Sequence, residues 1–526
     1  MIPSVRIRVA GGGLLIAAAI GCAPSARSRQ QSGVSDPQPA TRDPISLAEL
    51  DRDLHAFAAD SMRGRETGTA DALRAAAFIG RRLAELGLEP VGDSLYYQRV
   101  PMARQVVTPA TRIAVTRNGV SRLIRVGDEL APMLSLGDGL PEPRRSVSAD
   151  LVFAGYAMTS KASGRDDLAA VDLLNKVAVV LHGAPPGTTG PIRDSLNSDN
   201  ALAVQLARVA LKQPAAIIVL MTPETAKLYR QLYPSLMRDV RGQLTAVPPG
   251  MAALEVPMLL FGVAREGSPF LPKGWPADDS PQRLGSSFEA SIDVRREPFV
   301  GYNVIGRVPG TDPALRSTYV ALGAHYDHVG VLPTQSGDSI ANGADDDGSG
   351  TVALLAIARA TVQRPSRRST LFVWHAAEEK GLLGSAYFTS HPTVPMDSIV
   401  AMLNADMIGR NERDRLYVVG PMAAPNRLSA RLGEIIDSVN AASPAPFMID
   451  RSWDSFAHPE QIYQRSDHFN YARRGVPVAF FTSGVHPQYH DVGDDASLID
   501  YEKMRRVATL LLEIARAVGN DPNRPR

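Results

Sequence analysis

The segment Tyr-Val-Ala-Leu-Gly-Ala-His-Tyr-Asp-His, residues 319–328, joins a short apolar run directly to a polar cluster. Similar apolar runs follow it, and helical patterns flank them; the runs are 370–374, 399–403 and 476–481, and the helical patterns are 349–362 and 501–518. Near-continuous apolar strands that alternate with helices are typical of a mainly parallel α/β sheet. In such a sheet, ligands bind at the carboxyl ends of the strands. We therefore expect an α/β fold with a functional site where these strands end.

Polar clusters occur at those predicted strand ends, and eight of the ten histidines lie at or after position 325. Each cluster alone has an ordinary explanation, because a lone buried histidine is more often structural and an Asp-Gly segment is often only a turn or a calcium loop. Five clusters on successive strand ends are harder to explain as ordinary polar surface residues. They are GAHYDH (323–328), GADDDGSG (343–350), HAAEEKGLLGS (375–385), NADMIGR (404–410) and HPQYHDVGD (486–494).

The residue types in these clusters indicate a metal site. In an extended segment, His325 and Asp327 project to the same side, so the carboxylate can orient an imidazole that binds zinc. Three adjacent carboxylates at positions 345–347 repel one another unless cations neutralise them. Of the neighbours Glu378 and Glu379, one can bind metal while the other faces the attacking water.

Taken together, the five motifs resemble the dinuclear zinc aminopeptidase family, which includes bacterial leucyl aminopeptidases and glutamate carboxypeptidase. They occur in the family's order over about residues 300–515, and RGRETGT (63–69) with 86–100 resembles the family's opening. The resemblance implies the zinc-peptidase fold, with a mainly parallel central sheet flanked by helices. It also implies two zinc ions. His325 and Asp406 would bind one ion, Glu379 and His490 would bind the other, and Asp346 would bridge them.

The same resemblance assigns the catalytic roles. Glu378 would act as the general base for a hydroxide that bridges the two metals, and Tyr489 would donate to the oxyanion; a packing role beside His490 is the alternative for Tyr489. Asp467 would orient a metal ligand. The implied activity is a metallopeptidase, most readily an aminopeptidase that hydrolyses N-terminal residues from peptides. A carboxypeptidase, a dipeptidase or a non-catalytic binding protein of the same descent are the alternatives.

The sequence pattern is different between about residues 105 and 295, where short β-rich runs alternate with Pro/Gly loops. This region loosely resembles a protease-associated domain. We therefore predict an inserted β-rich domain at 106–295 within a discontinuous peptidase domain of 45–105 and 296–518.

The first 22 residues resemble a bacterial lipoprotein signal peptide. Arg6 and Arg8 precede a short apolar run, which ends at Ala-Ile-Gly-Cys, 19–22. Leucine is commoner than Ala19 at that position, and an ordinary signal peptide with an incidental cysteine is the alternative. We expect lipidation of Cys22, a flexible linker at 23–44, and a location in the cell envelope on the periplasmic or outer-membrane face, anchored to the membrane.

Composition and missing motifs exclude several other functions. The formal net charge of +1 gives no basic excess for nucleic-acid binding. The chain lacks the Gly-x-Ser-x-Gly elbow of serine hydrolases and the His-Glu-x-x-His motif of mononuclear zinc proteases. A single cysteine allows no disulfide within the chain. A complete two-metal ligand set also disfavours a one-zinc glutaminyl cyclase.

Overall fold

Two β-sheets organise the computed structural model, which describes residues 44–134, 143–160, 165–232, 243–246, 256–275, 278–332, 337–421, 429–456, 458 and 461–525. Pro44–Arg526 forms one compact unit. The predicted signal peptide, Cys22 and all but the last residue of the predicted linker lie outside the described residues. Among the described residues, no helix combines the length and the apolarity needed to cross a membrane.

The larger sheet has ten strands, and its four central strands are parallel in the order β16-β15-β17-β20. These strands are β15 (Tyr319–His325), β16 (Ser369–His375), β17 (Ile399–Ala405) and β20 (Val478–Thr482). They coincide with the four predicted apolar runs. Since their carboxyl ends meet at one edge, the polar segments that follow them come together there.

Further strands, most of them paired antiparallel, extend this parallel centre on both sides. Next to β16 lie β14 (Val294–Val308), β2 (Tyr97–Val107), β11 (Gln243–Ala246) and, beside β14, β1 (Glu89–Pro90); next to β20 lie β18 (Arg415–Val419) and β19 (Met448–Asp450). The α/β class is therefore confirmed, while the sheet as a whole is mixed.

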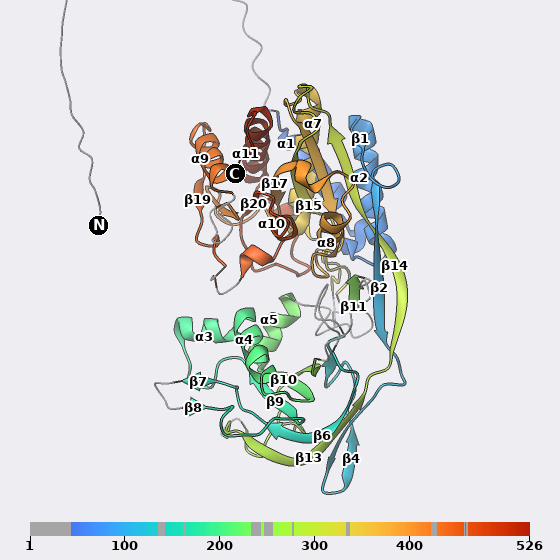
Figure 1. Cartoon of the computed structure of the whole chain (residues 1–526), viewed down its shortest axis with the longest axis vertical. Coiled ribbons are helices and arrows are strands. Elements are labelled where there is room, and N and C mark those ends of the chain that lie inside the picture. The colour runs from blue at the N-terminus through green and yellow to red at the C-terminus, as the bar shows by residue number, and fades with distance from the viewer. Residues whose placement is uncertain are drawn as a thin grey trace, which may run out of the picture. The chain divides into compact units, whose positions relative to one another are not determined.

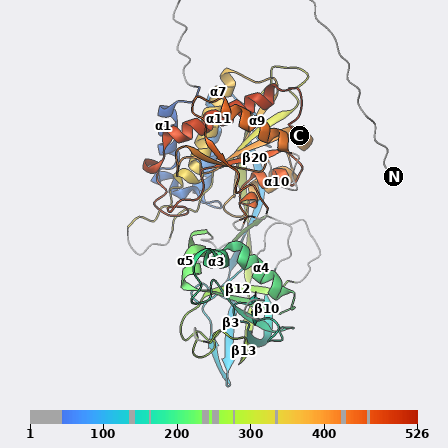
Figure 2. The ribbon, with the colours of Figure 1, turned by 90° about the vertical axis from the view of Figure 1, so that its left-hand side faces the viewer.

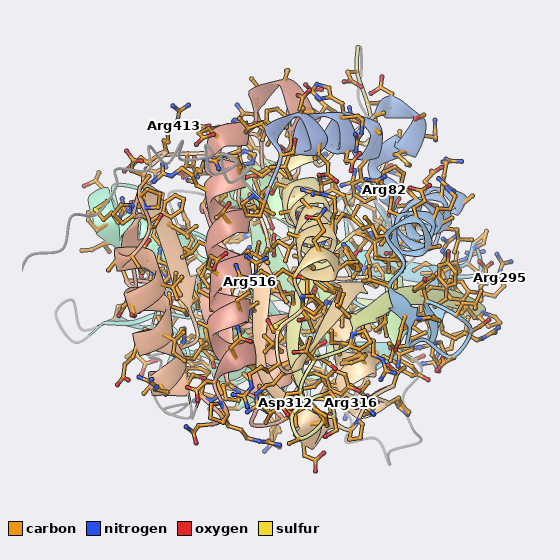
Figure 3. The ribbon with its side chains drawn as sticks, turned by 90° about the horizontal axis from the view of Figure 1, so that it is seen from above. Arg82, Arg295, Asp312, Arg316, Arg413 and Arg516 are labelled. Atoms are coloured by element: carbon orange, nitrogen blue, oxygen red, sulfur yellow. The ribbon has the colours of Figure 1, made fainter. Side chains whose placement is uncertain are left out.

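The helices cover both faces of this sheet. Alternate residues such as Val320 and Leu322 pack in one cluster, and Tyr319 and Ala321 pack in another, as the two-residue period of a strand requires. On the first face lie α1 (Leu47–Phe57), α2 (Ala70–Leu86), α7 (Gly350–Gln363), α9 (Ala430–Ala441) and α11 (Tyr501–Asn520). Figure 3 shows α7 and α11 side by side, with α1 against both. On the other face lie α8 (Leu383–Ser390) and α10 (His468–Ala472).

The helix α2 shows how local sequence sets these bounds. Thr69 precedes it, and its hydroxyl accepts a hydrogen bond from the backbone N–H of Asp71 at 3.2 Å. Gly87 ends it in the left-handed conformation, with φ of 75°. Thr69 and Gly87 thus set the two ends of α2.

The second sheet has eight strands in the order β4-β3-β13-β6-β9-β10-β12-β5. They are β3 (Arg112–Arg117), β4 (Val120–Leu123), β5 (Ala131–Pro132), β6 (Ser146–Phe153), β9 (Val177–His182), β10 (Ala216–Met221), β12 (Met258–Val263) and β13 (Gln282–Ser291). A two-stranded pair, β7 (Thr159–Ser160) and β8 (Arg165–Asp166), and three helices accompany it; the helices are α3 (Gly190–Asn197), α4 (Asp199–Ala210) and α5 (Pro223–Leu232), visible in green in Figure 2.

The two sheets are connected through neighbouring strands. Apart from β11, the chain leaves the first sheet after β2 and returns along β14, and β2 and β14 pair antiparallel from Val294↔Val107 to Val304↔Tyr97 (Figure 1). An insertion needs entry and exit points that lie close together, and this pair supplies them. The arrangement favours the proposed insertion of residues 106–295 into a peptidase domain of 45–105 and 296–518.

Candidate metal centre

Seven acidic and imidazole side chains converge at the carboxyl edge of the central parallel strands. They form two groups whose potential ligand atoms lie within 4.8 Å of one another in each group: His325, Glu378 and Asp406 in one, and His328, Asp346, Glu379 and His490 in the other. The predicted metal ligands His325, Asp346, Glu379, Asp406 and His490 are all brought together. His328 is an addition that the sequence analysis did not assign.

Asp346 connects the two groups. Its Oδ1 lies 3.3 Å from His325 Nε2, and its Oδ2 lies 3.1 Å from His490 Nε2. Across the first group His325 Nε2 is 3.5 Å from Asp406 Oδ1, and across the second His490 Nε2 is 3.0 Å from Glu379 Oε2. Ligands of a tetrahedral zinc ion lie about 3.2–3.6 Å apart, because the tetrahedral edge is about 1.6 times a bond of ~2.0–2.2 Å. The residues present therefore fit a pair of zinc ions.

The charges of the cluster also fit a metal pair. Burial raises the pKa of Asp346, but hydrogen bonds from His325 and His490 outweigh burial and hold that pKa well below its usual range. Burial likewise raises the pKa of Glu378 well above its usual range, and its carboxyl neighbours add to that effect. Buried carboxylates at this density require positive charge nearby, and metal cations supply it.

The carboxylates of the three adjacent aspartates contact different groups. Asp347 accepts hydrogen bonds from the backbone N–H groups of His325 (3.1 Å) and Gly350 (2.9 Å), and Asp345 accepts from that of Gly409 (2.6 Å). Only Asp346 reaches the metal groups. This explains why three carboxylates stand in one short segment, η2 (Ala344–Ser349): one faces the site and two fix the neighbouring strand ends.

The structure corrects the role predicted for the Asp327 carboxylate. His325 Nδ1 lies 3.1 Å from the backbone oxygen of Asp327 and 3.9 Å from the carboxylate. The carboxylate instead accepts from the hydroxyl of Thr67 (2.9 Å) and from the backbone N–H of Glu378 (3.1 Å). Asp327 thus orients His325 through its main chain and positions the loop of Glu378 through its side chain.

The expectation for Asp467 is corrected in a similar way. Its carboxylate lies 3.2 Å from Nδ1 of His375, a buried residue outside both metal groups. The neighbouring Ser466 makes the contact with a predicted ligand, since its hydroxyl donates to Asp406 Oδ2 at 2.7 Å. The two adjacent side chains before α10 thus point to different partners.

The comparisons with known proteins agree with this geometry. Residues 303–515 match the model of peptidase family M28. This segment of the chain is similar to peptidase family M28.

Fungal leucine aminopeptidases are similar to part of the chain. Leucine aminopeptidase 1 of Penicillium rubens is 31% identical over 245 residues, which cover 44% of this chain and 59% of that protein. For leucine aminopeptidase 1 of Trichophyton rubrum the identity is 29%, covering 43% of this chain and 60% of that protein. The chain thus spans less than two thirds of these relatives.

Solved structures share the fold over a greater length. An aminopeptidase from Aneurinibacillus sp. strain AM-1 has a TM-score of 0.55 at 17% identity, covering 92% of this chain and 96% of that one. BSAP, a zinc aminopeptidase from Bacillus subtilis, has a TM-score of 0.52 at 17% identity, covering 92% and 98%. The likeness shows the fold, and it extends beyond the segment that matches the M28 model.

A pocket with a volume of about 450 Å³, open solvent included, lies on one side of the candidate metal centre. His325, Asp346, Glu378 and Asp406 line it together with Tyr489, and the remaining lining is largely apolar: Met407, Trp453, Ile462, Arg465, Phe480, Thr482, Gly484 and Val485. Tyr489 stacks on His490 with ring centroids 3.8 Å apart. Both roles considered for Tyr489, as an oxyanion donor and as a packing residue, therefore have a structural basis, since it packs on His490 and also lines the pocket.

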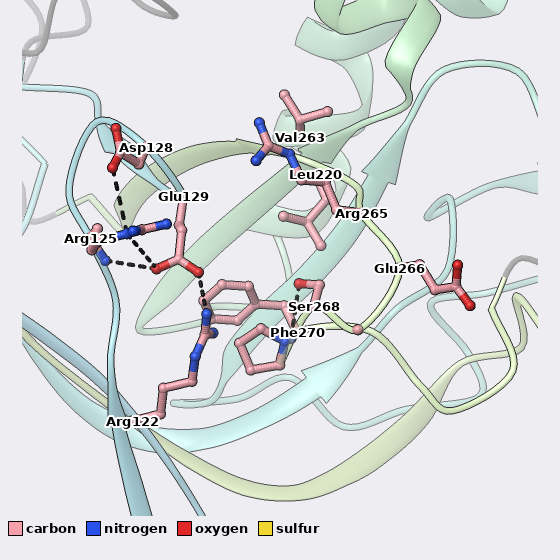
Figure 4. Close-up of a pocket in the computed structure, with 12 residues that line it drawn as sticks. Arg122, Arg125, Asp128, Glu129, Leu220, Val263, Arg265, Glu266, Ser268 and Phe270 are labelled. Atoms are coloured by element: carbon pink, nitrogen blue, oxygen red, sulfur yellow. Dashed lines mark hydrogen bonds and ion pairs between the residues drawn. The ribbon is translucent and has the colours of Figure 1, made fainter.

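A second cavity lies in the eight-stranded sheet, where β10 and β12 end (Figure 4). Its volume is about 550 Å³, open solvent included. Arg122 pairs there with Glu129, and Arg125 lies 3.5 Å from Asp128 and 3.8 Å from Glu129. Positive and negative side chains are thus matched, and neither metal group includes a residue of this cavity.

Proposed function

We propose that this protein is a dinuclear zinc aminopeptidase that removes apolar residues from the N-termini of peptides. The observation that carries the proposal is the position of Asp346, whose two carboxylate oxygens face two separate ligand groups beside a pocket lined by Glu378. Two zinc ions, held by His325, Asp346 and Asp406 on one side and by Asp346, Glu379 and His490 on the other, would supply Lewis-acid polarisation of the scissile carbonyl and of water.

The residues of the chain supply the remaining chemistry. Glu378 lines the pocket with its side chain 11% exposed, so it can accept a proton from the attacking water and deliver it to the leaving amine. Burial raises the pKa of Tyr489 well above its usual range, so its hydroxyl stays protonated and can donate to the developing oxyanion.

The pocket itself favours particular substrates. Glu378 lines the inner end of the pocket, where its carboxyl oxygens can accept a hydrogen bond from a protonated N-terminal amine. Met407, Ile462 and Phe480 form apolar walls that suit an apolar side chain next to that amine.

A panel of aminoacyl p-nitroanilides tests this function. Burial of a leucine side chain stabilises a bound substrate by about 1.5–3 kcal/mol. We therefore expect kcat/KM for the leucyl substrate to exceed that for the glycyl substrate by about 10- to 100-fold, and we expect no turnover of the matched N-acetyl-leucyl substrate. Equal rates for the leucyl and glycyl substrates would contradict the assignment of the apolar pocket.

A carboxypeptidase is the second candidate, because Arg465 also lines the pocket. A guanidinium can hold a terminal carboxylate in a bidentate pair. Cleavage of N-acetyl-Leu-Leu, without cleavage of leucyl p-nitroanilide, would support this candidate and overturn the aminopeptidase.

We further propose that Cys22 is lipidated and anchors the protein in the cell envelope. Support comes from the basic residues Arg6 and Arg8, the short apolar run and the small residues before the cysteine. Substitution of Cys22 by serine should move the protein from the membrane fraction to the soluble fraction when the full chain is expressed in a bacterial host. Metabolic labelling with a radioactive fatty acid should label the wild type alone. A variant that still fractionates with membranes and still takes up label would rule out this modification.

A further inference from the structure

The two metal groups differ in their access to the pocket. His325, Glu378 and Asp406, which form one group, all line it, and Asp346 lines it from the other group. The remaining members of that other group, His328, Glu379 and His490, are absent from its lining. The side chain of His328 is fully buried, and that of His490 is 3% exposed. One metal position therefore faces the pocket, and the other is enclosed by protein.

His328 and His490 approach the enclosed position in the same manner. His328 Nδ1 lies 3.0 Å from Glu379 Oε1 and 3.6 Å from Asp346 Oδ2. His490 Nε2 lies 3.0 Å from Glu379 Oε2 and 3.1 Å from Asp346 Oδ2. Their rings stand nearly perpendicular, at 77°, with centroids 5.5 Å apart. Two imidazole nitrogens thus face the same two carboxylates, at spacings close to the edges of a zinc tetrahedron.

We propose that His328 is a further metal ligand, so that the enclosed position has four protein donors and the pocket-facing position has three. The inference rests on the proposed zinc function and adds a sixth ligand to the five that the sequence predicts. Structural zinc sites are closed by four protein ligands, whereas catalytic sites keep one position open. The enclosed ion then binds more tightly and organises the site, while the pocket-facing position admits water and substrate.

Two substitutions separate this role from a simpler one. His328 could instead act only as a hydrogen-bond donor to Glu379, a contact that its Nδ1 makes at 3.0 Å. Substitution H328A removes both roles. Substitution H328Q keeps an N–H donor but replaces the imidazole with a poor zinc ligand.

Competition against a chromophoric zinc chelator measures the outcome on the purified protein. Wild type should bind two zinc ions with distinct affinities. Both H328A and H328Q should weaken one ion by at least about 100-fold and leave the second within about 10-fold. The matched control is H468Q, which replaces a fully buried histidine outside both metal groups and should keep both affinities. Circular dichroism of the metal-free proteins checks that each variant folds.

The possible failures are distinguishable. Two tightly bound zinc ions in H328Q, with a loss only in H328A, would reduce His328 to a hydrogen-bond donor and overturn the inference. Wild-type affinities in both folded variants would overturn it as well. Wild-type protein that binds fewer than two zinc ions would overturn the proposed dinuclear function together with this inference.

Discussion

Substitution E378Q should reduce kcat by about 10²- to 10⁴-fold while both zinc ions stay bound. Glutamine has nearly the shape of glutamate, but its amide cannot accept the proton of the attacking water, and transfer by a positioned base is worth that range in rate. Glu378 is placed for this role, because it lines the pocket while its backbone N–H donates to Asp327 at 3.1 Å. Steady-state kinetics on leucyl p-nitroanilide, with zinc content by mass spectrometry, measures both expectations.

Glu379, the neighbour of Glu378, provides the matched variant. Glu379 lies 3.0 Å from both His328 and His490, on the enclosed side of the cluster. Substitution E379A should therefore lower zinc affinity by at least about 10- to 100-fold, the loss that even residues supporting a ligand cause. Zinc loss in E378Q with none in E379A would mean that the two roles are reversed. Retained activity in E378Q would remove the proposed base.

The second large effect is expected at Arg65, in the RGRETGT segment. Its guanidinium is fully buried and donates to four backbone oxygens, namely those of Tyr326 (2.9 Å), Phe57 (3.3 Å), Asn342 (2.6 Å) and Gly343 (2.8 Å). Two of these acceptors precede the aspartate triplet, and one follows His325. Burial lowers the pKa of Arg65 to about 10, although nearby aspartates oppose that effect, so the side chain stays charged at neutral pH.

Substitution R65A should destabilise the protein by at least about 3 kcal/mol and weaken zinc binding. It leaves buried carbonyl oxygens without donors, and each such group costs about 1–3 kcal/mol. The matched control is R63A, because Arg63 has almost the same positive φ (49° against 50°) but a side chain that is 54% exposed. The control should change stability by no more than about 0.5 kcal/mol. Urea unfolding of the metal-free proteins and zinc competition measure both effects; equal shifts in the two variants would refute the role of Arg65.

Much of the fold was predictable from local patterns. The four apolar runs coincide with β15, β16, β17 and β20, and the helices predicted near 349–362 and 501–518 coincide with α7 and α11. Continuous apolar runs, helical periodicity and a terminal glycine are properties of neighbouring residues, so the sequence carries them directly. The antiparallel strands on both sides of the parallel centre, such as β2 and β14, depend on pairing across almost 200 positions, and no local pattern records such pairing.

The sequence by itself determined the ligand chemistry of this protein. Histidine, aspartate and glutamate at five strand ends, in the order of a known family, predict His325, Asp346, Glu379, Asp406 and His490 as metal ligands, and the structure brings these five together. Only the tertiary structure decided which neighbouring groups support them. Ser466 rather than Asp467 contacts Asp406, the main chain of Asp327 orients His325, and His328 joins the enclosed group. The physical reason is that residue types define which atoms can bind a metal, whereas the direction of each side chain depends on backbone turns and on packing against segments far away in the chain.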